Sequence, residues 1–354
     1  MNELTSLALF VGDAVLVAAG GWLLMRTLQP RPAGLPEILA GWLLAALLLV
    51  GASAVALGSQ GWLGPRGFFW AHVVALAGLV AARRGSGREE GRALAAVAAR
   101  VRDFFRQPGG ARWAAAALVI VLLLLGLLAA FGQPMVFDAM TYRLPRIGQW
   151  LQDGRIAHLT TDDERLNYMA IGPDLVVAWL IGAWPSGFMF APLAQTLGGG
   201  LLLAATIGLA RLTGLSRLAA LGAAALVLGM GNVAPQMTSL HSALFSALVY
   251  AAGFSLLLGA ARRGDGTWLG GAGAAFALTA KGTVFYLLPG ALVWVVWFGW
   301  RHLAGWSGWA RTLAGGVAAG LIFLLPPLLR NEASYGNLAA PPGDLLLHYG
   351  PALT

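Results

Sequence analysis

Long apolar segments alternate with short polar ones along most of the chain. A helix needs about 20 apolar residues to cross the hydrocarbon core of a bilayer. Backbone groups inside lipid must bond one another, which favours helices. The pattern therefore predicts an all-α polytopic membrane protein of about ten transmembrane helices. The predicted spans are residues 6–25, 37–57, 68–82, 113–131, 188–210, 215–232, 239–260, 267–280, 282–300 and 312–329.

The composition supports a membrane protein and limits the kinds of partner that we expect. Of the 354 residues, 58% are hydrophobic and 11% are charged, whereas soluble domains have about 25% charged residues. The net charge of +8 comes from arginines between the spans, as expected of loops that stay in the cytoplasm. We therefore expect membrane lipids as partners and no nucleic acid. The absence of cysteine excludes disulfides and thiolate metal sites.

The distribution of arginine predicts an orientation. Residues 83–112 contain eight arginines and no long apolar run, which predicts a cytoplasmic linker with an interfacial helix. An outer amino terminus places 16 of the 22 arginines in the cytoplasm. This holds only if residues 174–184, which are too few to cross, form a juxtamembrane or re-entrant helix at the outer face.

One polar stretch, residues 133–173, interrupts the apolar pattern, and we call it the outer loop. Four outward-facing arginines break the charge rule and would suit an anionic lipid headgroup. The alternative is that they pair with the acids of the same loop. These acids are Asp138, Asp153, Asp162, Asp163 and Glu164, and the arginines are Arg143, Arg146, Arg155 and Arg165.

Asp138 lies a few residues beyond a predicted span, in a largely apolar setting. A carboxylate there could act as a general base, or it could cap the helix that follows. Tyr142, Arg143 and Arg146 share its helical face at spacings of about four. Pro145 predicts a kink or a fresh helix start nearby.

Other polar residues carry weaker signals. Asp162, Asp163 and Glu164 could supply a second carboxylate or bind a divalent cation, but the same residues suit a solvated helix start. Asp13 lies within the first span, where we expect it to reach the membrane interface. For His72 we expect packing or a local hydrogen bond.

Three motifs resemble a known family. Residues 136–175, VFDAMTYRLPRIGQWLQDGRIAHLTTDDERLNYMAIGPDL, resemble the first outer loop of bacterial GT-C glycosyltransferases, in the branch of protein mannosyltransferases and aminoarabinose–lipid A transferases. The Lys281–Gly282–Thr283 stretch is similar to the family's Lys-Gly-Thr stretch. The segment from Leu329 to Asn337 is similar to its Leu-Arg-Asn segment. The first motif departs from the family at Arg143, where relatives have histidine.

The resemblance implies a polyprenyl-phosphate-linked sugar as donor and a lipid, glycan or protein as acceptor. It implies Asp138 as catalytic base and Lys281 and Arg330 as ligands of the lipid phosphate, assisted by Tyr142, Arg143 and Arg146. No metal ligand set is implied, and a divalent cation stays an open alternative. The implied location is the bacterial inner membrane, with the active site facing the periplasm or exterior.

The resemblance also divides the chain. Residues 113–337 would form a GT-C-like core of seven helices, whose first outer loop is helical. Residues 1–82 would be three additional helices, 83–112 the linker and 338–354 an outer-face tail that is shorter than in relatives. A role as a non-catalytic subunit that binds or transports lipid-linked sugars is the alternative function.

Overall fold

The computed structural model describes most of the chain as helices joined by turns. The described residues are 3–29, 32, 34–132, 137–161, 163–168, 170–182, 187–240, 242–280, 289–290, 293, 296–297, 300–301 and 305–338. No strand occurs among them. Six described helical segments are long and apolar enough to cross a membrane. The protein is therefore an all-α membrane protein, as the hydrophobic pattern predicts.

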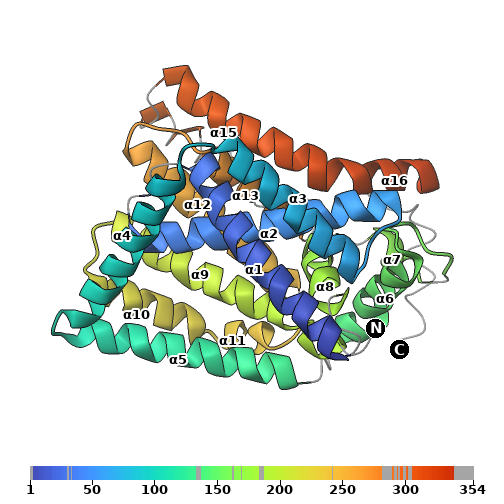
Figure 1. Ribbon diagram of the computed structural model, residues 1–354, viewed down its shortest axis with the longest axis horizontal. Coiled ribbons are helices and arrows are strands. Elements are labelled where there is room, and N and C mark those ends of the chain that lie inside the picture. The colour runs from blue at the N-terminus through green and yellow to red at the C-terminus, as the bar shows by residue number, and fades with distance from the viewer. Residues whose placement is uncertain are drawn as a thin grey trace.

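The first half of the chain follows the predicted order. The helices here are α1 (Glu3–Leu28), α2 (Leu35–Gln60), α3 (Pro65–Ala82), α4 (Gly87–Arg106) and α5 (Gly110–Phe131). Four of them coincide with predicted spans, and α4 is the helix expected in the linker. In Figure 1, α4 crosses one end of the bundle, while the outer-loop helices lie at the other end.

The outer loop is largely helical. It contains a π-helical turn, η1 (Ala139–Arg143), followed by α6 (Leu144–Asp153) and the short α7 (Arg165–Tyr168). The next helix, α8 (Gly172–Gly182), is the short apolar segment that we expected at the outer face. Nearly all of α8 is buried, since it packs against α2, α6 and α9.

In the second half, four predicted spans overlap described helices and two do not match a described helix of that length. Predicted span 215–232 is the shorter α10, which ends at a glycine, and predicted span 282–300 lies mostly outside the described residues. The number ten therefore stays a prediction. The elements are η2 (Gly187–Phe190), α9 (Leu193–Leu212), α10 (Arg217–Leu228), α11 (Val233–Met237), α12 (Ser242–Arg262), α13 (Trp268–Leu278), α15 (Gly305–Ala319), η4 (Gly320–Leu324) and α16 (Leu325–Tyr335).

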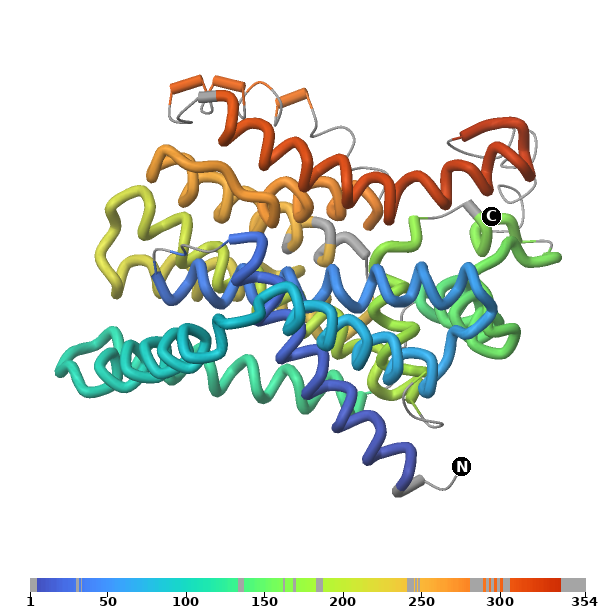
Figure 2. The backbone as a smooth tube through the Cα atoms, turned by 45° about the horizontal axis from the view of Figure 1, so that its top comes forward, coloured from blue at the N-terminus to red at the C-terminus, as the bar shows by residue number. Residues whose placement is uncertain are grey.

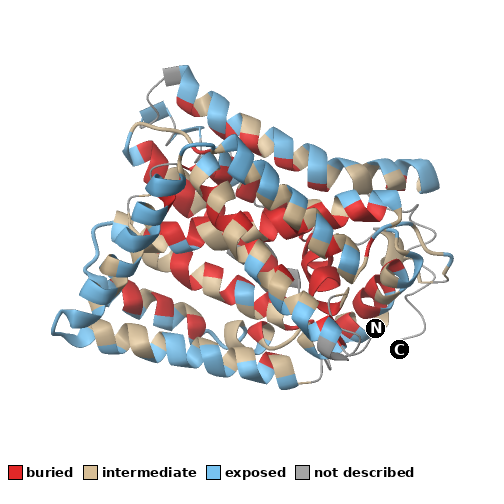
Figure 3. Ribbon diagram, viewed as in Figure 1, coloured by how far each residue is buried: buried red, intermediate tan, exposed pale blue. Residues whose placement is uncertain are grey.

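Helix α2 lies at the centre of the bundle (Figure 3). In its most apolar window 61% of the residues are buried, compared with 6% for α5. It packs against α1, α8, α9, α12 and α13. The N-terminal helices are thus packed into the same unit as the rest of the described chain, and α5 turns most of its apolar surface outward.

Small residues allow some helices to approach closely. A Cβ on Gly271 would lie 1.9 Å from the carbonyl oxygen of Thr312, and one on Gly315 would lie 2.0 Å from that of Trp268. Helices α13 and α15 are therefore in backbone contact, as glycine-rich membrane helices can be.

The expectation for Asp13 is wrong. Asp13 is only 3% exposed and does not reach the membrane interface. Its carboxylate contacts His72 Nδ1 at 2.7 Å and accepts a hydrogen bond of 2.7 Å from Trp179 Nε1. Because an unpaired carboxylate is costly in an apolar interior, these partners explain its position. The pair ties α1 and α3 to α8, and His72 makes the local bond expected of it.

Candidate functional site

The helix that carries Asp138 has one unusual turn. The backbone is helical from Phe137 to Asp153, and the N–H of Leu144 donates to Ala139 across the π turn. Pro145 follows at once and has no N–H to continue the α-helical pattern, which confirms the break expected there. The helix-cap interpretation of Asp138 is wrong, because Asp138 is already helical and its side chain makes no capping hydrogen bond.

Arg143 and Arg146 converge on one carboxylate. Arg143 Nη1 lies 2.7 Å from Asp174 Oδ1, and Arg146 Nη2 bonds the other oxygen, Oδ2. Asp174 and Arg146 are fully buried, and Arg143 is 2% exposed. Among the described residues, the acid that Arg143 and Arg146 pair with therefore lies beyond the outer loop, whereas Arg165 pairs with Asp163 inside it, as the alternative interpretation held. The partner of the first two arginines, Asp174, lies in the first turn of α8, just beyond the outer loop.

Neighbouring groups hold both guanidinium groups in place. Arg146 donates at 3.3 Å to the carbonyls of Leu166 and Ala170, and it lies 5.2 Å from the ring centre of Trp150. Burial alone would lower the pKa of Arg143, but Asp174 raises the pKa above its ordinary value. The ion pair with Asp174 therefore favours the charged form of Arg143 inside the protein.

Arg330 brings α16 to the same region. Its Nη1 donates to the carbonyl of Ile156 at 3.2 Å, and it lies close enough to Arg146 for the two charges to repel. Ile156 is itself held by the last turns of α2, because its N–H donates to the carbonyl of Gly58 at 3.2 Å. The N-terminal helices thus help to position the segment that Arg330 contacts.

The acids of the second polar stretch have separate partners. Asp163 pairs with Arg165 at 2.6 Å, as expected of a local helix start. Burial raises the pKa of Asp163, but hydrogen bonds from Arg165 outweigh this and lower the pKa below its ordinary value. Glu164 accepts a hydrogen bond from the Tyr335 hydroxyl on α16. Asp162 and Lys281 lie outside the described residues.

His158 is a member of this region that the sequence argument did not identify. Its ring lies 5.3 Å from the ring of Tyr335. Burial is the main cause that lowers its pKa, and the charge of Arg330 lowers the pKa further. Figure 2 shows the end of α16 beside the outer loop, where Tyr335 meets His158 and Glu164.

Asp138 is half-buried and makes no hydrogen bond or ion pair with any residue that the structure describes. Its charge acts on Tyr142, whose pKa is raised mainly by burial and further by Asp138, while Arg143 opposes the shift. Tyr142 is buried against Arg143, with 5.6 Å between ring centre and guanidinium carbon. Asp138 is thus a carboxylate beside a buried cationic cluster.

We call Arg143, Arg146, Asp174 and Arg330 the arginine cluster. Three of these residues, the arginines, are among the site residues predicted from the sequence. The role of Asp174 was not predicted. An acid in the first turn of an eleven-residue apolar helix needs a cationic partner, and that signal could have identified it. Within the described parts of the chain, no three acids or histidines come together as metal ligands.

No family model, curated protein or solved structure matches this chain.

Proposed function

We propose that the protein is a membrane glycosyltransferase that moves a sugar from a polyprenyl-phosphate donor to an acceptor. The observation that carries the proposal is a carboxylate, Asp138, next to a buried cluster with excess positive charge. Two arginines pair with Asp174 and Arg330 lies near Arg146, so these four residues have a formal charge of 3 − 1 = +2. A buried excess of this kind favours an anion such as a phosphate.

The cluster supports one order of events. Asp138 takes the proton of an acceptor hydroxyl, whose oxygen forms a bond to the anomeric carbon from the side opposite the donor phosphate. The bond between that carbon and the phosphate oxygen breaks, and its electron pair leaves with the lipid phosphate. Arginines fixed before the reaction stabilise the departing charge, which is the kind of interaction that contributes most to such steps.

The test compares two acids of one helix. Cells expressing the wild type, Asp138→Asn or Asp153→Asn are analysed by mass spectrometry for polyprenyl-phosphate sugars, free polyprenyl phosphate and surface glycans. Asp138→Asn should lower turnover by about 100-fold or more, as expected for loss of a general base. Asp153 is exposed and bonds only Gln149 among the described residues, so Asp153→Asn should transfer normally.

A transfer rate of Asp138→Asn equal to the wild-type rate would remove Asp138 from the mechanism.

The pairing of Arg143 and Arg146 with Asp174 favours a second candidate function, that of a non-catalytic protein that binds lipid-linked sugars. In that case wild type and Asp138→Asn would both retain the lipid, and neither would release free polyprenyl phosphate.

A further inference from the structure

Helix α4 lies along one membrane face. Four residues join it to the end of α3, and three join it to the start of α5. Since α3 and α5 are both candidate spans, the two ends of α4 are held at the same face. A helix of 20 residues is about 30 Å long, so α4 must run along the surface between them, as Figure 1 shows.

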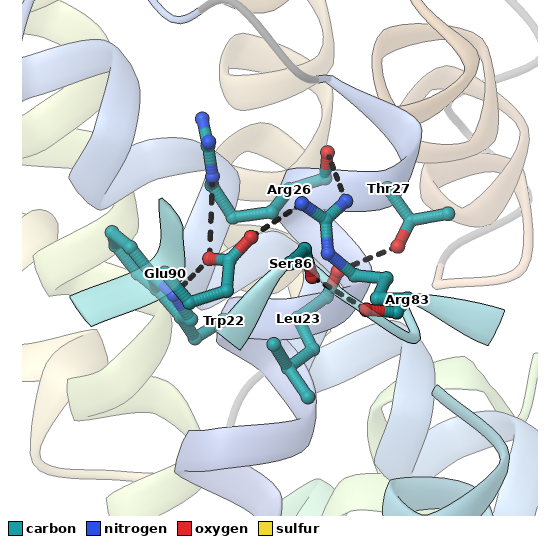
Figure 4. Close-up of polar contacts among 7 residues, drawn as sticks. All are labelled: Trp22, Leu23, Arg26, Thr27, Arg83, Ser86 and Glu90. Atoms are coloured by element: carbon teal, nitrogen blue, oxygen red, sulfur yellow. Dashed lines mark hydrogen bonds and ion pairs between the residues drawn. The ribbon is translucent and has the colours of Figure 1, made fainter. Parts of the chain in front are cut away.

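A buried acid sets the rotation of α4 about its axis. Glu90 accepts a hydrogen bond of 3.0 Å from Trp22 Nε1, lies 3.4 Å from Arg26 Nε and pairs with Arg83 (Figure 4). Ala93 and Val97 continue the same side and pack against the core. One side of α4 is therefore fixed to α1 and its neighbours, and the other sides are exposed.

The exposed part of α4 includes an amphipathic stripe. Leu94, Ala98, Arg102 and Arg106 follow one another at four-residue spacing, so they form one ridge of the helix, and all four are exposed. Leu94 is 50% exposed, and Phe105, three residues after Arg102, is 43% exposed. Apolar side chains thus lie beside arginines on a surface that no described residue covers.

The charge of the segment is strongly positive. Residues 83–112 contain eight arginines and three acids, a formal charge of 8 − 3 = +5. One of the acids, Glu90, is already paired with Arg26 and Arg83. Asp103 lies 3.8 Å from Arg102, with both side chains about 60% exposed, and such exposed pairs are weak.

We propose that α4 binds anionic phospholipid headgroups along the stripe from Leu94 to Arg106. The apolar residues enter the boundary between headgroups and acyl chains, and Arg102 and Arg106 contact phosphates. Basic amphipathic helices bind anionic membranes by this combination. The headgroup surface of the membrane that holds α3 and α5 lies next to α4 along its length.

The absence of cysteine allows a clean test. Full-length protein with a spin label on Ala98→Cys is placed in nanodiscs of phosphatidylcholine, or of phosphatidylcholine with about a third phosphatidylglycerol. The collision rate of the label with a water-soluble nickel reagent should fall about twofold or more in the anionic discs. Salt at about 1 M, where the screening length is about 3 Å, should remove the difference.

Two pairs of substitutions with equal charge change give the control. Arg102→Gln/Arg106→Gln should abolish the difference, whereas Arg92→Gln/Arg100→Gln, which do not belong to the ridge of Leu94, Ala98, Arg102 and Arg106, should retain it. Arg102→Lys/Arg106→Lys should retain most of it and shows that changes at these positions are tolerated. Equal collision rates in the two lipids would overturn the proposal. Equal losses of the lipid-dependent difference from both glutamine pairs would also overturn it, because either result would mean that the stripe is exposed to water and does not bind lipid.

Discussion

Two similar charge clusters lie at opposite ends of the bundle. In each cluster, two arginines pair with one acid. The first comprises Arg143, Arg146 and Asp174, and the second comprises Arg26, Arg83 and Glu90. In the first, the side chains are at most 3% exposed, whereas in the second they are 11–19% exposed.

The difference in exposure separates two kinds of role. In the first cluster water cannot replace a lost partner, so each charge depends on the others. In the second, water can reach the arginines, whose side chains are 18–19% exposed. The first cluster therefore fixes the start of α6 to α8, and the second fixes α4 to α1 and to the end of α3.

The largest effect should follow from Asp174→Asn. The change leaves two buried guanidinium groups without their counter-charge and should lower the free energy of unfolding by about 3–5 kcal/mol. Titration with a denaturing detergent measures this. Asp153→Asn, at an exposed position, serves as the control and should change it by less than about 0.5 kcal/mol.

A smaller effect should follow from Glu90→Gln. The glutamine can keep some of the hydrogen bonds, and water can reach the two arginines, so the loss should be about 1–2 kcal/mol. The neighbouring Glu89 is exposed, and Glu89→Gln should be nearly neutral. A loss from Glu90→Gln as large as that from Asp174→Asn would contradict the distinction between the two clusters.

Acidification should weaken the outer-loop region through His158. Its pKa in the folded protein lies below the ordinary value of 6.5, mainly because of burial. The unfolded chain therefore binds a proton that the folded chain does not, so stability falls as the pH drops below about 6.5. His158→Gln should reduce this pH dependence, measured by detergent titration at several pH values. An unchanged slope would exclude His158 as its source.

The smallest effect should follow from Asp163→Asn. The lowered pKa of Asp163, set by Arg165 against the opposing effect of burial, means that its contribution is present above its ordinary pKa of 3.8 and is lost as the pH falls through the lower folded value. The pair is local and partly exposed, so the loss at neutral pH should be below about 1 kcal/mol. A larger loss would give Asp163 a role beyond its own helix start.

Hydrophobic length predicted most of the fold that the structure describes. It located α1, α2, α3 and α5 within a few residues, because apolar runs of that length have few alternatives to helices in lipid. It could not predict which helix is central. Helices α2 and α5 are similarly apolar, yet one is the most buried candidate and the other the least, and that difference depends on partners far away in sequence.

For the candidate site, local spacing predicted the helix and its break but not its partners. Pro145 indicates a disruption because proline lacks an N–H, and the second π turn, η4, also precedes a Leu-Pro pair. The pairing of Arg143 with Asp174 spans 31 residues and depends on how α8 packs. The sequence therefore identified the charged residues and left their partners undetermined.

The π turn at Ala139–Arg143 changes how positions on this helix should be counted. A π turn contains one residue more than an α turn for the same rotation. Side chains five residues apart across the π turn therefore align, whereas in the rest of the helix side chains four residues apart align. Removing one residue from the turn would leave helices on both sides intact and would rotate Asp138 by about 100° relative to Arg143. The relation between the acid and the arginine cluster therefore depends on chain length as well as on residue type, and a deletion can separate them without altering either.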